Sequence, residues 1–148
     1  MKSLIENFLQ NKNFYLSLVG EHLFITMVAI TIAIIVGVAV GVAISEKRKI
    51  AGIVISIVNV LYTIPSIALL GVLISVTGIG NKTAIIALTL YALLPVVRST
   101  YTGIVNIDEK IVEASEAMGS TKFQTMYKVK LPLAFPVIFS AIRNMVTM

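Results

Sequence analysis

The sequence predicts an all-α, polytopic membrane protein, and three observations lead to this fold class. Of the 148 residues, 57% are hydrophobic and only 13% are charged, whereas a typical soluble domain has about 25% charged residues. The apolar residues form long uncharged blocks, and so small a domain could not bury that much apolar surface in one core. Within a bilayer only helices and closed barrels satisfy every backbone group, and these blocks lack the alternation of barrel strands.

Composition also excludes several classes of function. The chain has no cysteine and one histidine, so a disulfide framework and a cysteine- or histidine-based metal cluster are excluded. The net charge of +5 fits a membrane protein whose lysines and arginines gather in cytoplasmic loops. Nucleic acid is not an expected partner, because a basic patch that binds it needs a soluble face.

Residues 1–20 are predicted to be an extracytoplasmic or interfacial segment. Its apolar residues Leu4, Ile5, Phe8 and Leu9 share one helical face, which is typical of a helix lying on the outer membrane surface. A frayed terminus is the other interpretation. His22, at the edge of the first apolar block, is interpreted as an interface residue.

The first spanning helix is predicted at 23–44, where 22 residues carry no charge. An α-helix of that length reaches about 33 Å, which is enough to cross the hydrocarbon core. Gly37 and Gly41 are four residues apart and predict close packing against another helix.

The second span is predicted at 53–76, with Pro65 expected to kink or break it. One side of this helix carries a polar stripe spaced three, four and three residues apart, flanked by a tyrosine: Ser56, Asn59, Thr63 and Ser66, with Tyr62. Polar groups in a span turn toward other helices or toward a water-filled path. Hydrogen bonding between helices and lining of a translocation path are both consistent with the stripe.

The third span is predicted at 83–104, with a second expected kink at Pro95. Arg98 near its end either snorkels to the headgroups or gates a substrate. The fourth apolar segment, 133–148, has only 16 residues and includes Arg143, whereas a span usually needs about 20. The sequence therefore predicts a chain truncated in its fourth span.

The basic residues predict the orientation. Seven lie in the links after the first and third spans (Lys47, Arg48, Lys49, Lys110, Lys122, Lys128 and Lys130), and three lie on the opposite side (Lys2, Lys12 and Lys82). The positive-inside rule then places the N-terminus outside and residues 105–132 in the cytoplasm.

Residues 105–132 are predicted to fold as two short helices. Asp108 is a good N-cap and Gly119 a natural stop for the first helix. Thr121 and Gln124 fit a capping box at the start of the second, and Pro132 is expected to end it. An apolar face of this second helix, formed by Phe123, Met126 and Tyr127, could pack on the protein's own helix ends or insert into a partner's groove.

Residues 113–132 keep the spacing of a known motif: Glu113, Ala114 and Ser115, three residues, Gly119, nine residues, Val129, one residue, Leu131 and Pro132. This pattern resembles the EAA loop (Glu-Ala-Ala, three, Gly, nine, Ile, one, Leu-Pro) of permease subunits of binding-protein-dependent ABC importers. Ser115 replaces the second alanine and Val129 replaces the isoleucine. From about Glu21 onward the chain also resembles the subfamily that imports glycine betaine, carnitine and choline as osmoprotectants.

The resemblance implies a type I ABC importer permease domain over 21–148, incomplete at its C-terminus. It implies that residues 105–132, hereafter the coupling segment, sit in a cleft of a separate cytoplasmic ATPase. That partner binds the ATP, so the chain itself is expected to be neither an enzyme nor a cofactor protein. An extracytoplasmic substrate-binding protein and a second permease subunit, identical or different, are the other implied partners.

The resemblance also assigns residues within the coupling segment. Glu113, Ala114, Ser115 and Gly119 would form its bend. Leu131 and Pro132 would fix its exit, and Phe123, Met126 and Tyr127 are our choice for the knob that enters the ATPase. An aromatic cage for a quaternary ammonium group is expected on the binding protein, and none is recognisable in this chain.

Three other functions compete with this one. Permeases for amino acids or other small solutes share the loop. A self-powered carrier or channel would need an acidic residue within a span, and all seven acidic residues lie in flanks or loops. A truncated membrane protein that does not transport is the third possibility.

Overall fold

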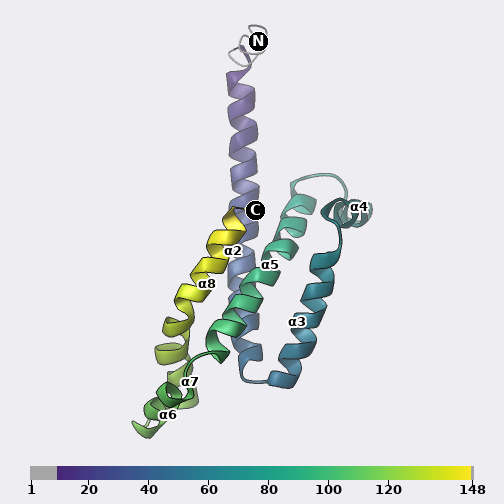
Figure 1. The fold of residues 1–148 in the computed structure, drawn as a ribbon. Coiled ribbons are helices and arrows are strands. Elements are labelled where there is room, and N and C mark those ends of the chain that lie inside the picture. The colour runs from purple at the N-terminus through teal and green to yellow at the C-terminus, as the bar shows by residue number, and fades with distance from the viewer. Residues whose placement is uncertain (1–9, 148) are drawn as a thin grey trace.

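The structure, a computed structural model, describes residues 10–147, and among them it contains helices and no β-strand. The predicted all-α class is therefore confirmed. Four helices run along one bundle: α2 (Lys12–Ser45), α3 (Arg48–Thr63), α5 (Asn81–Val105) and α8 (Leu131–Val146). α5 contacts each of the other three and so forms the centre of the fold (Figure 1).

α2 is longer than the span that the sequence predicts. It is one helix of 34 residues, or about 50 Å, and its N-terminal turns extend well beyond the rest of the bundle (Figure 1). The described part of the predicted N-terminal segment is thus continuous with the first span. Residues Leu4, Ile5, Phe8 and Leu9, the basis of the predicted interfacial helix, lie outside the described residues.

The second predicted span is two helices, which confirms the expected break at Pro65. α3 ends at Thr63, α4 (Ser66–Thr77) begins just after Pro65, and the two helices are bent by 94°. Ile64 is extended, with φ −68° and ψ 125°, because the ring of a following proline disfavours helical geometry. The hydroxyl of Tyr91 on α5 donates a hydrogen bond to the Ile64 carbonyl that the break leaves outside the helix.

Pro95 and Pro132 are also predicted to disrupt helices, but neither residue ends a helix. α5 continues from Asn81 to Val105 through Pro95. The helix that begins at Lys122 also continues through Pro132, as α7 (Lys122–Thr125), a π-helical turn η1 (Met126–Lys130) and α8. In the π turn the Leu131 N–H bonds to the carbonyl of Met126, five residues back. This wider turn accommodates a proline whose ring would collide with the carbonyl four residues back in a regular helix.

Because of this continuation, the fourth apolar segment is longer than predicted. Lys122–Val146 spans 25 residues and is long and apolar enough to cross a membrane, as are α2 and α5. The bent pair α3–α4 would be a fourth crossing if its two helices count as one span. Lys128 and Lys130 lie within this continuous helix.

The contact between α2 and α5 depends on small residues. Ala29, Ala33, Gly37 and Gly41 are buried at four-residue intervals along α2. A Cβ added to Gly37 would lie 2.7 Å from Val96 Cγ1, and one added to Gly41 would lie 2.5 Å from Thr100 Cβ. The backbone of α2 at these glycines therefore packs directly on Val96, Val97 and Thr100 of α5, which is the close packing that the glycine spacing predicts.

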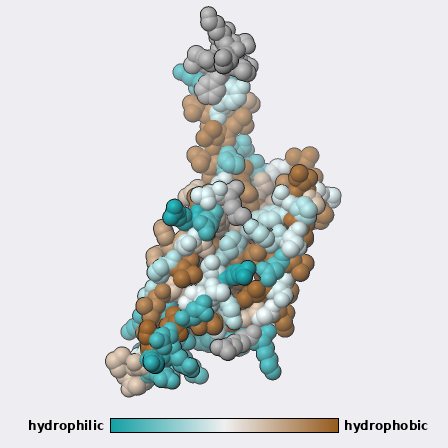
Figure 2. Space-filling view, in the orientation of Figure 1, coloured by the Kyte–Doolittle hydropathy of each residue, from teal (hydrophilic) through white to brown (hydrophobic). Residues whose placement is uncertain are grey.

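Polar and apolar residues are distributed as a membrane requires. Hydrophobic residues cover the visible sides of α2 and α4, and hydrophilic residues gather around the end that carries α6 (Glu109–Ala117) and α7 (Figure 2). Large apolar side chains such as Phe24, Ile53 and Phe139 are more than half exposed, which suits a lipid solvent. The link between α2 and α3 and the coupling segment lie at the same end of the bundle (Figure 1).

Candidate coupling segment and translocation path

The first helix of the coupling segment has well-formed caps at both ends. At its start the Asp108 side chain accepts a hydrogen bond of 3.0 Å from the Lys110 N–H. At its end Gly119 has φ +87°, its N–H bonds to the Glu116 carbonyl, and the Ser120 N–H bonds to the Ser115 carbonyl. These two bonds form the Schellman motif, which requires a left-handed residue where Gly119 stands.

The second helix begins with the predicted capping box. The Thr121 hydroxyl accepts from the Gln124 N–H at 3.3 Å, and the Gln124 side chain accepts from the Thr121 N–H at 2.9 Å. Both helix starts and the glycine stop are thus confirmed, and the segment is a folded pair of helices. Glu113 and Ala114 lie on the exposed surface of α6.

A buried pair of hydroxyls joins the two helices. Ser115 and Thr125 are 3% and 1% exposed, and their hydroxyl oxygens lie 3.2 Å apart. Ser115 is the residue that replaces an alanine of the EAA pattern, so this bond depends on the departure from it. Sequence reasoning missed Thr125, because nothing in the order of residues shows that positions ten apart on two helices meet.

The predicted knob divides into an exposed part and a buried part. Phe123 and Tyr127 are 70% and 49% exposed, and their ring centroids lie 4.4 Å apart. Met126 is only 4% exposed and shares a buried cluster with Ile104 of α5 and Ala134 of α8. Its assignment to the knob is therefore wrong: Met126 fastens the segment to the bundle, while Phe123 and Tyr127 form the exposed aromatic pair.

The exit of the segment also differs from the prediction. Leu131 packs at the edge of the buried cluster around Met126, and Pro132 is exposed within a helix that continues. The π turn explains why Met126 and Ala134 lie on the same face of this continuous helix. Eight residues of regular α-helix would set Met126 and Ala134 about 80° apart, and one extra residue in a wider turn returns them to one face.

The polar stripe is divided between two helices. Ser56, Asn59 and Thr63 are exposed on α3, whereas Ser66 belongs to α4, beyond the bend. The side of α3 that packs on the bundle carries Ala51 and Val58 instead. The described helices of this chain therefore do not bury the stripe. Arg98 is exposed on α5.

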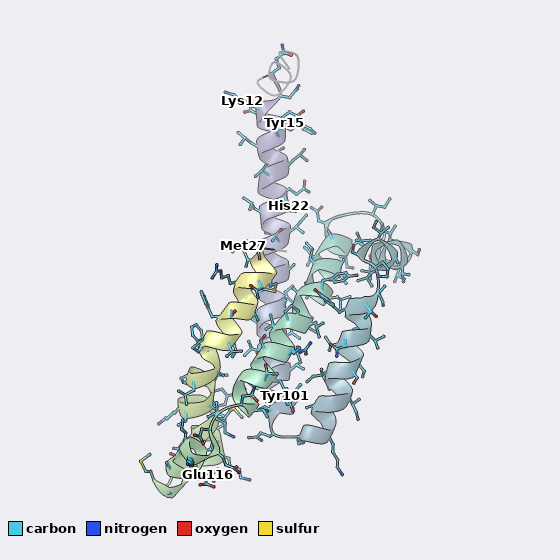
Figure 3. All side chains as sticks on the ribbon, in the orientation of Figure 1. Lys12, Tyr15, His22, Met27, Tyr101 and Glu116 are labelled. Carbon is cyan, nitrogen blue, oxygen red and sulfur yellow. The ribbon has the colours of Figure 1, made fainter. Side chains whose placement is uncertain are left out.

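Two of the predicted path residues meet in a pocket of about 550 Å³ where five helices converge. Tyr62 comes from the end of α3, Ser66 from the start of α4, and Tyr91 from α5. His22 of α2 contributes to the wall, and Figure 3 shows it at the level of the α4 end of the bundle, away from the coupling segment. Sequence reasoning missed Tyr91, which is 29 residues from Tyr62 in the chain.

The arrangement of helices and the folded coupling segment lead to the comparison with known proteins. Residues 14–148 match the family described as binding-protein-dependent transport system inner membrane component. The chain belongs to this family. It is therefore a multi-pass membrane protein of the permease type. The likeness to this family is not limited to residues 113–132 but extends over nearly the whole chain.

Relatives within the family carry more specific names. The carnitine transport permease protein OpuCD of Listeria monocytogenes serotype 1/2a (strain 10403S) is 37% identical over 97% of this chain and 65% of its own length. The glycine betaine/carnitine/choline transport system permease protein OpuCD of Bacillus subtilis (strain 168) is 40% identical over 91% of this chain. The chain spans 65% and 59% of the lengths of these two relatives.

A solved structure supports the fold. The MetNI methionine ABC transporter, in an inward-facing conformation, contains a chain with a TM-score of 0.76 and 32% sequence identity. The match covers 86% of this chain and 66% of the other. The helices of this protein are therefore arranged as in an ABC importer permease.

Proposed function

We propose that this chain is the membrane-spanning subunit of an ATP-driven importer for a quaternary-ammonium osmoprotectant such as glycine betaine, carnitine or choline. It lines the translocation path, pairs with a second permease subunit and receives the solute from an extracytoplasmic binding protein. ATP is bound and hydrolysed by a separate cytoplasmic ATPase. Its N-terminus lies outside, and the coupling segment lies in the cytoplasm of a cell whose plasma membrane holds the complex.

The observation that carries this proposal is the shape of the coupling segment. Two capped helices project at the end of the bundle where the basic links lie, and they present Phe123 and Tyr127 with large exposed fractions. An exposed aromatic pair on a short helix is the kind of anchor that fits a groove on a partner. Relatives named as carnitine and glycine betaine permeases support the solute class.

The test is co-purification of the detergent-solubilised chain with the ATPase of an osmoprotectant importer. Phe123→Ala removes the most exposed ring of the pair, and we expect the affinity to fall at least about tenfold, as for a truncated interface anchor. Phe139→Ala is the matched control, since Phe139 is 55% exposed on α8 outside the segment. Equal retention of the ATPase by both variants would contradict the proposal.

A second pair of variants tests the geometry of the segment. Gly119→Pro imposes a φ near −65° where the structure has +87° and removes the N–H that bonds to Glu116. We expect it to abolish association, whereas Gly119→Asn, which tolerates the left-handed region, should retain most of it. If the assembled complex takes up methionine but no quaternary ammonium solute, the solute class is wrong and the permease role stands.

A further inference from the structure

The pocket where the five helices converge contains a pair of aromatic rings in contact. The centroids of Tyr62 and Tyr91 lie 6.0 Å apart with an interplanar angle of 65°. The Tyr91 hydroxyl is bound to the carbonyl of Ile64 at the break between α3 and α4, so its ring is held in place from the far end. Both rings line the pocket.

The rest of the wall is mostly apolar. Thr26, Ser66 and His22 are its polar members besides the tyrosines, and the remaining lining residues are Ala29, Ile30, Leu88, Ala92, Met145 and Val146. Within residues 10–147, no aspartate or glutamate lines the pocket. A cation that enters this pocket therefore finds aromatic rings in place of a carboxylate.

This wall suits one kind of ligand. A trimethylammonium group has no N–H to donate, and aromatic faces attract it electrostatically and by contact. A carboxylate needs donors instead, and the Ser66 hydroxyl lies on the same wall at the first residue of α4. A compact molecule that carries both groups brings its own counter-charge, so it does not require an acidic residue in the pocket.

We propose that the pocket lined by Tyr62, Tyr91 and Ser66 is a transit site for a trimethylammonium carboxylate zwitterion. The ammonium group lies against the two rings and the carboxylate accepts from Ser66. This inference rests on the proposed function and goes beyond it, because it locates a solute site within the permease itself. It also ranks the solutes: glycine betaine and carnitine, which carry a carboxylate, bind more tightly than choline, which does not.

The experiment measures binding to the 148-residue chain in lipid nanodiscs by ligand-observed saturation-transfer NMR. The signal comes from the methyl protons of the ligand, which is glycine betaine, choline or 3,3-dimethylbutanoate. The same readout therefore serves the wild-type chain and every variant. The last compound has the shape of glycine betaine with carbon in place of the charged nitrogen. We expect glycine betaine to bind at least about tenfold more tightly than this isostere, a difference within the range of a desolvated cation–π contact.

Variants assign the two halves of the site. Tyr62→Leu should weaken glycine betaine about tenfold and Tyr62→Phe should leave it nearly unchanged, because the ring is kept. Ser66→Ala should weaken glycine betaine and leave choline unaffected. Tyr101→Leu is the matched control, since Tyr101 packs with a separate cluster around Ile44 and Val97.

Several outcomes would overturn the site. The site is wrong if the isostere binds as tightly as glycine betaine or if choline binds more tightly than glycine betaine. It is also wrong if the wild-type chain gives no saturable signal with glycine betaine. If Tyr62→Leu binds like the wild type while the assembled complex imports glycine betaine, the site is wrong and the proposed function stands. If the assembled complex imports no quaternary ammonium solute, the proposed function itself fails.

Discussion

Gly41 places the backbone of α2 directly against α5. A Cβ at this position would lie 2.5 Å from Thr100 Cβ and 3.1 Å from the Val97 carbonyl oxygen. Neither atom belongs to the far end of a flexible side chain, so neither can move aside without shifting a helix. The spacing of Gly37 and Gly41 predicts this close approach, although their partners on α5 cannot be read from the sequence.

Gly41→Ala should therefore destabilise the fold by about 1–3 kcal/mol, the usual cost of an overpacked interior. Gly52→Ala is the matched control on α3, where an added Cβ meets nothing within 4 Å, and it should be neutral or stabilising by up to about 1 kcal/mol. Denaturation in mixed micelles, followed by circular dichroism, measures both. Equal stability of the two variants would show that α2 and α5 do not pack in this way.

At the scale of single residues, the helix caps could be predicted from the sequence, but the burial of Met126 and the contacts of Tyr91 could not. Asp108, Gly119 and the Thr121–Gln124 box act within a few residues of themselves, so their chemistry is visible in the sequence. Met126 and Tyr91 depend on helices far away in the chain. Both are ordinary apolar or aromatic residues until the fold shows their neighbours.

At the scale of elements, the π turn is the feature that sequence reasoning missed. Pro132 is a valid stop signal in a regular helix, because its ring collides with the carbonyl four residues back. The turn at 126–130 removes this conflict and lets one helix join the coupling segment to α8. The bend at Pro65 was predictable as a break, but its 94° angle follows from tertiary packing.

Deletion of Lys128, which is exposed within the π turn, tests this account. The shorter chain should close into a regular helix that still keeps Met126 and Ala134 on one face. Pro132 would then lie in a regular helix interior, and we expect a loss of about 3 kcal/mol in unfolding free energy. Combining the deletion with Pro132→Ala should restore most of it. A combined variant as unstable as the deletion would contradict the explanation.

At the scale of the whole molecule, the helices alternate in direction so that the α2–α3 link and the coupling segment share one end (Figure 1). The sequence predicts this shared end from the number of spans, because two predicted spans separate the two links, and the distribution of lysine and arginine predicts which side of the membrane it faces. It could not predict the pocket, which needs five helices to be placed relative to one another. It also could not predict that the polar stripe is left exposed by the described helices.

The absence of cysteine makes the proposed orientation directly testable. Single cysteines are introduced by Glu116→Cys in the coupling segment and by Lys82→Cys in the first turn of α5, both at exposed positions. In intact cells a membrane-impermeant maleimide should label position 82 and spare position 116 until the membrane is permeabilised. Labelling of position 116 in intact cells would place the coupling segment outside and overturn the proposed function.

The glycine contacts between α2 and α5 also have a mechanical consequence. At Gly37 and Gly41 the backbone of α2 packs directly on Val96, Val97 and Thr100 of α5, so the two helices form a single stiff beam. Met126 packs against this beam at Ile104 of α5. Tyr91 lies on the same helix thirteen residues from Ile104, or about 20 Å along the axis. A displacement of the coupling segment would thus reach the tyrosine pair as a tilt of the whole beam.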